Sequence, residues 1–143
     1  MSNPAITGDM GLKQYSAVVD LSTTSTENIL GNTASSGKVL EVYLSVMNAD
    51  GTSAATIDIW LYNQDGVPMN SDVGAYQAAI GADTVAGSSL GEIGPKTLSV
   101  AAAGGQVVYD KLAPLYLLED QSIVVQASAA DDLTVILSWI VKG

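Results

Sequence analysis

The sequence predicts an all-β domain, an antiparallel β-sandwich of about eight strands with a jelly-roll or Ig-like course, an N-terminal arm and one long inserted loop. Apolar residues recur with a period of two far more often than with the helical period of 3.6, as in residues 39–47, VLEVYLSVM. Pairs of turn-forming residues, such as Asp50-Gly51 and Gly104-Gly105, separate the apolar runs. This spacing of strands and turns favours a sandwich over a βαβ fold.

Each predicted strand is a short run that alternates or is rich in β-branched residues, and each gap holds residues that favour a tight reversal. The predicted strands are residues 15–21, 39–47, 55–63, 97–101, 106–110, 115–118, 122–128 and 133–141, with residues 27–30 as a candidate ninth. The predicted turns lie at Ser36-Gly37, Asp50-Gly51, Asp65-Gly66, Gly104-Gly105, Glu119-Asp120 and Asp131-Asp132.

Two segments lack this pattern and set the predicted domain organisation. Residues 1–14 are expected to form an extended arm, and residues 15–143 a single sandwich domain. Within the domain, residues 65–95 are rich in Gly, Ala and Ser and read as a long connection, with one helical turn expected near residues 75–80. Such long connections are usually functional or ordered by a partner, although plain flexibility is an open alternative.

Composition bears on the partners of the chain. Apolar residues make up 48% of the 143 residues and charged residues only 14%, which predicts apolar surface to bury and therefore oligomerisation. The formal net charge of −10 argues against direct binding to nucleic acid or to an anionic membrane. Neither a secretory signal nor a membrane-spanning run is recognisable, so the expectation is a soluble protein made in a cytoplasm.

The residues that usually carry chemistry are missing. The chain has no Cys and no His, so we expect no catalytic residue, no metal site and no cofactor. The acidic residues Asp50, Glu119-Asp120 and Asp131-Asp132 could bind calcium or act as a glycosidase pair, but they sit at predicted turns, where Asp commonly caps its own backbone. Turn formation is the preferred interpretation.

An aromatic row suggests an interaction surface. If residues 39–63 form a hairpin, one face carries the apolar side chains of the core, and the other carries Tyr43, Trp60 and Tyr62 beside carboxylates. The inward residues would be Leu40, Val42, Leu44, Val46, Ile57, Ile59 and Leu61. Such a row suits a protein interface or a sugar site, or is covered by the same chain. Tyr76, in the long connection, is a fourth interface candidate.

The second half of the chain resembles a known group of proteins. Residues 112–139, LAPLYLLEDQSIVVQASAADDLTVILSW, are similar to the closing half of small β-sandwich virion proteins of tailed bacteriophages. In that group a Pro-Leu-Tyr-Leu strand, an acidic turn, a strand ending in Gln-Ala-Ser-Ala-Ala, an Asp turn and a final strand recur. Residues 37–61 resemble an earlier strand, turn and strand of the same group. Together these segments cover about two-thirds of the chain.

The resemblance implies a non-enzymatic capsid decoration or cement protein, made in the bacterial host cytoplasm and located in the virion. It implies a homotrimer bound to the major capsid protein or another virion protein, with the arm and the long connection reaching neighbouring subunits. Two alternatives stay open: a neck or tail accessory protein of the virion, and a carbohydrate-binding or receptor-binding β-sandwich module.

Overall fold

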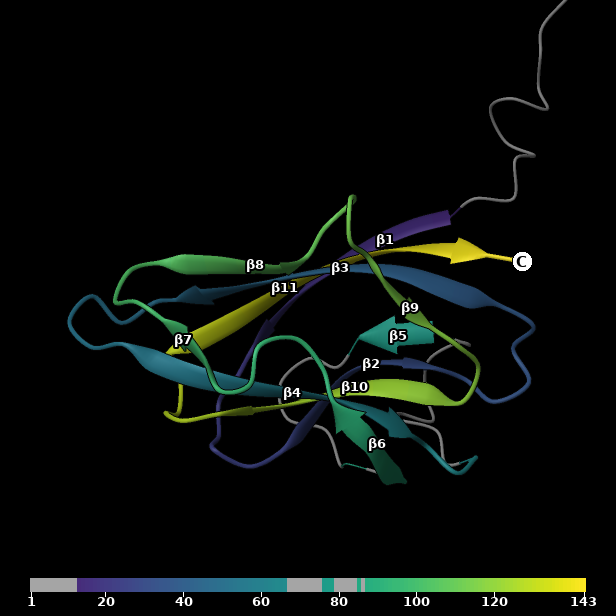
Figure 1. Ribbon diagram of the computed structural model, residues 1–143, viewed down its shortest axis with the longest axis horizontal. Coiled ribbons are helices and arrows are strands. Elements are labelled where there is room, and N and C mark those ends of the chain that lie inside the picture. Colours follow the sequence, from purple (N-terminus) through teal and green to yellow (C-terminus); the bar gives the residue numbers. More distant parts are fainter. Residues whose placement is uncertain (1–12, 67–75, 79–84, 86) are drawn as a thin grey trace, which may run out of the picture.

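Two antiparallel β-sheets pack face to face in the computed structural model, which describes residues 13–66, 76–78, 85 and 87–143 (Figure 1). Sheet A consists of β1 (Lys13–Asp20), β11 (Leu133–Lys142), β3 (Val39–Asn48), β8 (Gly105–Tyr109) and β9 (Leu115–Leu117). Sheet B consists of β5 (Tyr76–Ala78), β2 (Glu27–Asn32), β10 (Gln121–Ala127), β4 (Ala55–Asn63), β6 (Ser88–Glu92) and β7 (Leu98–Val100). No helix in the described part of the chain is long and apolar enough to cross a membrane.

The strand order is that of a jelly roll. Sheet A runs β1-β11-β3-β8 with β9 also paired to β3, and sheet B runs β5-β2-β10-β4-β6 with β7 also paired to β4. The first four strands thus each pair with strands from later in the chain, as in a long antiparallel ribbon wrapped into two sheets. The predicted β-sandwich is confirmed, and of its two predicted courses the structure has the jelly roll.

Alternation of side chains builds the core between the sheets. Along β3 and β11 every second side chain is buried, because successive residues of a strand point to opposite faces. All seven residues of β3 and β4 predicted to point inward do so: six are fully buried, and Leu61 packs against the core with part of its surface exposed. The faces of these strands were therefore predicted correctly.

The predicted hairpin of residues 39–63 is wrong. Strand β3 lies in sheet A and β4 in sheet B, so the chain between them turns a corner from one sheet to the other. Asn48 fixes this corner: its side-chain amide donates to the carbonyl oxygens of Ser53 at 3.0 Å and Val100 at 3.1 Å. Its Oδ1 accepts a hydrogen bond from the backbone N–H of Asp50 at 2.9 Å. These bonds direct the chain toward sheet B instead of back along β3.

All nine predicted strands are present, with ends that differ by a few residues; β1 begins two residues earlier, at Lys13. Within the predicted connection the structure adds β5 and β6. The helical turn expected near residues 75–80 is wrong, since Tyr76–Ala78 is a strand paired with β2. Residues 1–12 of the predicted arm, and residues 67–75, 79–84 and 86 of the connection, lie outside the described residues.

The predicted turns use aspartate where the backbone is left-handed. Asp65, Asp120 and Asp131 have φ values of 54°, 64° and 64°. Aspartate tolerates this conformation better than most residues because its short polar side chain can bond locally. The Asp120 carboxylate also accepts hydrogen bonds from the backbone N–H of Gly66, at 2.9 and 3.2 Å, and so joins the two turns.

Candidate functional site

The outer face of sheet A, called the A face below, is the side of that sheet that points away from sheet B. It carries every second side chain of β1, β3 and β11, with Val107 of β8 and Tyr116 of β9. Several large apolar side chains on it are exposed: Val18, Met47, Val107 and Tyr116. No described strand covers the A face, so the sheet presents a partly apolar surface to its surroundings.

The register of the strands lines up the apolar groups. Val18 on β1 lies opposite Ile136 on β11, which lies opposite Ser45 on β3, which in turn lies opposite Val107 on β8. Directly opposite residues share a face and contact one another. We call Val18, Ile136 and Val107 the apolar row. Val18 is 62% exposed and Val107 67% exposed, so the two ends of the row are open.

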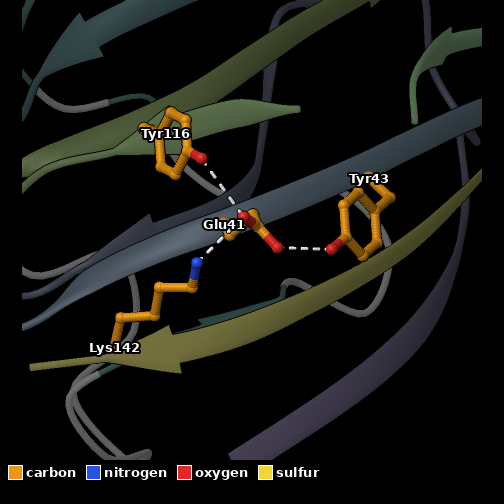
Figure 2. A network of polar contacts seen from close by, with 4 residues as sticks. All are labelled: Glu41, Tyr43, Tyr116 and Lys142. Carbon is orange, nitrogen blue, oxygen red and sulfur yellow. Dashed lines mark hydrogen bonds and ion pairs between the residues drawn. The ribbon is translucent and has the colours of Figure 1, made fainter. Parts of the chain in front are cut away.

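A polar cluster of Glu41, Tyr43, Tyr116 and Lys142 lies on the same face (Figure 2). Glu41 and Tyr43 are two residues apart on β3 and so share a face, while Tyr116 lies opposite Glu41 on β9. Glu41 accepts hydrogen bonds from the hydroxyl of Tyr43, from the hydroxyl of Tyr116 at 3.2 Å and from Lys142 Nζ at 3.0 Å. The cluster thus links β3, β9 and β11, and the Glu41 side chain is only 13% exposed.

These contacts hold Glu41, Tyr43 and Lys142 in their ordinary ionisation states at neutral pH. The hydrogen bond from Tyr43, followed by that from Lys142, lowers the pKa of Glu41. The hydrogen bond that Tyr43 donates to Glu41 raises the pKa of Tyr43. The separate hydrogen bond that Lys142 donates to Glu41 is the main cause of the raised pKa of Lys142. A general acid or base needs a pKa near the working pH, and these shifts move each pKa away from neutrality. The cluster is suited to holding strands together or to contacting a partner.

Protonation of Glu41 at acid pH is expected to weaken the hydrogen bonds and the ion pair of this cluster. Because the pKa of Glu41 is lowered on folding, its contribution to stability is present above its usual value of 4.5 and is lost as the pH falls through the folded pKa. An NMR titration of the Glu41 carboxyl should give a midpoint below 4.5. In the Glu41→Gln variant the pKa of Tyr43 should return toward 10.0. A Glu41 midpoint at or above 4.5 would contradict this arrangement.

The four predicted interface residues do not lie on one face. Tyr43 is on the A face, whereas Trp60 and Tyr62 point outward from sheet B on the opposite side of the sandwich. The shared aromatic face is therefore wrong, because it depended on the hairpin of β3 and β4. Tyr76 belongs to β5, whose backbone pairs with β2; its side chain is outside the described residues. The role of these four residues at an interface stays a prediction.

The outer face of sheet B is partly covered and partly recessed. Beside Trp60, the outward residues Val124, Ser122 and Asn28 are fully buried. Further along β4 and β10 lies an open polar recess of about 400 Å³. It is lined by Thr24, Thr56, Asp58, Gln126, Ala127 and Ser128. Hydroxyl, carboxylate and amide groups meet there on the face that also carries Trp60.

Of the acidic residues proposed as turn formers, Asp50 caps the backbone of its own turn, and Glu119 binds a neighbouring turn. Asp50 Oδ1 accepts hydrogen bonds from the backbone N–H and the hydroxyl of Thr52, both at 2.8 Å, and these bonds lower the pKa of Asp50. Glu119 Oε1 accepts a hydrogen bond from the backbone N–H of Gly37 at 2.8 Å. Among the described residues no group of three or more acidic side chains is arranged to hold a metal ion.

Among the residues of the A face and its surroundings that sequence reasoning missed are Val18, Tyr116 and Leu112. Leu112, in the loop between β8 and β9, is 95% exposed. The sequence could have indicated this residue, because Leu112 lies in the turn-like run Asp110-Lys-Leu-Ala-Pro114. An apolar side chain in a turn does not belong to the buried face of a strand. Val18 and Tyr116 gave no such signal, because alternation assigns a side chain to a face without telling whether that face is covered.

No protein-family model matches this chain, and no curated protein sequence matches it. Among solved structures, the chain is similar to the acidic stable capsid structure of Helicobacter pylori bacteriophage KHP30, with a TM-score of 0.40 and 9% identity over 92% of this chain and 93% of that chain. It is also similar to the VLP of the giant freshwater prawn Macrobrachium rosenbergii extra small virus, with a TM-score of 0.36 and 12% identity over 92% of this chain and 79% of that chain. At these values the function has to be argued from the residues of the chain itself.

Proposed function

We propose that this chain is a non-enzymatic structural protein of a bacteriophage virion, which binds the outside of the capsid shell as an oligomer and stabilises it. The observation that carries the proposal is the A face: a rigid jelly-roll sandwich presents a partly apolar sheet that no described strand covers. Residues 37–61 and 112–139 resemble small virion proteins. This resemblance suggests that the A face binds other proteins of a virion.

The side chains of the described residues support a binding role. The carboxylates of Asp50, Asp120 and Glu119 are engaged by backbone groups of turns, and Glu41 is held ionised by its three donors. Carboxylates that accept hydrogen bonds in this way fix the conformation of the turns and strands around them. A protein that reinforces a shell needs rigidity and complementary surface more than reactive groups.

Charge supports a protein partner over a nucleic acid. Fifteen acidic residues against five basic ones leave a net charge of −10. Binding to DNA depends on neutralising phosphates with Lys and Arg, and this chain has five Lys and no Arg. A position on the outside of the shell, away from the packaged genome, fits this charge.

The test combines solution mass with shell binding. The purified chain should be an oligomer by light scattering and should co-sediment with empty phage shells. Bovine serum albumin, another acidic protein, serves as the control for non-specific pelleting. A chain that stays in the supernatant with intact shells would contradict the proposal. A chain that assembles into closed particles by itself would make it a shell subunit instead.

A neck or tail accessory protein is the nearest alternative. It would form a ring at one position of the virion and not a lattice over the shell. The number of copies per particle, measured by quantitative mass spectrometry of purified virions, separates the two functions. The copy number of a decoration protein rises with the area of the shell, whereas that of a ring protein is set by the symmetry of the ring.

A carbohydrate-binding module is favoured by one observation, the polar recess on the outer face of sheet B, whose lining residue Asp58 lies two positions along β4 from Trp60. An aromatic ring next to carboxylate, amide and hydroxyl groups is the usual composition of a sugar site. Binding on a glycan array that is lost in both Trp60→Ala and Asp58→Ala would support this function. Glycan binding that survives both substitutions would place the sugar elsewhere.

A further inference from the structure

The loop between β8 and β9 holds a leucine away from the rest of the protein. Leu112 is 95% exposed, and Figure 1 shows this loop rising above sheet A on the side away from sheet B. The side chain therefore adds almost nothing to the core. A single exposed leucine is common on protein surfaces, so its position needs to be considered together with the shape of the loop and with the face below it.

The loop is rigid because Asp110 organises it. The backbone N–H and C=O of Asp110 bond to those of Ala113, with N···O distances of 3.3 and 3.2 Å. Asp110 Oδ1 accepts two more hydrogen bonds, from the backbone N–H groups of Leu112 and Ala113, both at 2.9 Å. Pro114 follows and fixes its own φ angle. A loop fixed in advance loses little conformational entropy when it binds, so Leu112 is suited to be an anchor.

The A face below the loop is almost neutral, although the chain as a whole is strongly acidic. Its described charged side chains are Asp20, Glu41 and Lys142, and the last two form an ion pair at 3.0 Å. Across a chain with a net charge of −10, most surfaces would repel a second copy. The A face is a surface on which two copies can meet with little electrostatic repulsion.

The A face also has a suitable size. Four strand positions at a spacing of about 4.8 Å, and ten residues at about 3.3 Å along β3, give a flat area of about 600 Å². The relief of the side chains and the raised loop increase this area toward the ~800 Å² per partner of an ordinary stable interface. Its exposed apolar groups, Val18, Met47, Val107 and Tyr116, are spread over β1, β3, β8 and β9.

We infer that copies of this chain associate through the A face, and that Leu112 of one copy packs against the apolar row of another, near Val18 and Ile136. The apolar row crosses sheet A from β8 to β1, and its Val18 end is on the edge strand opposite the Leu112 loop. When two sheets stack around a twofold axis parallel to their strands, the loop edge of each sheet meets the β1 edge of the other. The interface therefore predicts a dimer or an even-numbered oligomer, in place of the trimer that the resemblance implies. The inference deepens the proposed function and rests only on its oligomeric part.

The first test is the mass of the chain in solution. Wild type should be oligomeric by sedimentation velocity, and Leu112→Asp and Val18→Asp should each raise the dissociation constant by at least about 100-fold, because the twofold axis repeats each contact and every substitution removes two buried apolar side chains. Leu90→Asp is the matched control, since Leu90 is 54% exposed on β6 of sheet B. All three variants should keep the wild-type far-ultraviolet circular dichroism spectrum, because the replaced side chains lie outside the core.

The second test uses the absence of cysteine from the sequence, which leaves no background thiol. Leu112→Cys and Val18→Cys copies, mixed and mildly oxidised, should form a mixed disulfide, because the inferred packing brings their Cα atoms within about 7 Å. A mixture of Leu90→Cys and Val18→Cys copies should form far less.

Two results would overturn the inference: a wild-type chain that is monomeric by sedimentation, or an oligomer that withstands both Leu112→Asp and Val18→Asp. Shell binding is measured separately on the same samples. An oligomer that is sensitive to both substitutions but never pellets with shells would support the interface while removing the decoration role.

Discussion

Replacing Leu137 by alanine is expected to lower the free energy of unfolding by about 2–5 kcal/mol. Leu137 lies at the centre of β11, where it is fully buried between Leu44 on β3 and Ala17 on β1. Truncation removes buried methyl groups and leaves a cavity that the surrounding sheets cannot close without distorting their hydrogen bonds. For a domain that is stable by about 5–15 kcal/mol, this is a large fraction of the total.

Urea denaturation followed by tryptophan fluorescence measures the effect, and thermal unfolding should show a melting temperature lower by roughly 10 °C. Leu90→Ala is the matched control, because the same atoms are removed from an exposed side chain on β6. The control should change stability by less than about 0.5 kcal/mol. A loss below about 1 kcal/mol in Leu137→Ala, with the control unchanged, would mean that the two sheets do not pack as described.

Sequence alone predicted which side chains of β3 and β4 face the core, because alternation is a local property. In β3 the alternation of Leu40, Val42, Leu44 and Val46 with polar residues allows one buried face only. A shift of the register by one residue would expose all four side chains. The alternation therefore determines which side chains of a strand are buried, wherever one side of the sheet is packed against the core.

The pairing of the strands could not be predicted in the same way. Residues 49–54 fit a hairpin loop and a corner between sheets equally well, since β3 and β4 alternate identically in both cases. The corner is decided by the contacts of Asn48 with Ser53 and with the distant Val100. No short-range pattern reports a hydrogen bond that spans 52 residues.

The strand β6 was missed for a related reason. All five residues of Ser88–Glu92 are exposed, and the segment contains two serines and a glycine, which disfavour strands. It is a strand because β4 offers it a free edge, with Trp60 opposite Glu92. Pairing with an existing edge overrides weak local propensity.

The candidate site was predicted only in part. Tyr43 was selected from its position on β3 and does lie on an open face, in contact with Glu41. Trp60 was assigned to the same face because the two strands were taken as neighbours, and it lies on the other side of the sandwich. Alternation assigns faces within a strand, whereas the arrangement of the sheets decides which faces coincide.

Replacing Asn48 by alanine is expected to cost on the order of 2–3 kcal/mol, because the carbonyl oxygen of Val100 would be left buried without its donor. The Asn48 side chain is almost fully buried and makes three hydrogen bonds, which tie the corner after β3 to the end of β7. Buried polar groups that lose a partner pay the full penalty of desolvation, so the loss exceeds the net value of an ordinary hydrogen bond.

Asn63→Ala is the control for this change. The Asn63 side chain accepts an exposed hydrogen bond from the backbone N–H of Asp65 at 2.9 Å, and water can replace it. We expect Asn63→Ala to cost about 1 kcal/mol or less in the same denaturation experiment. In Asn48→Ala, amide hydrogen exchange should also quicken at residues 49–54 and at β7, while β1 and its partner β11 keep their protection. Equal costs for the two substitutions would mean that Asn48 does not hold the corner, and that the chain passes from sheet A to sheet B for another reason.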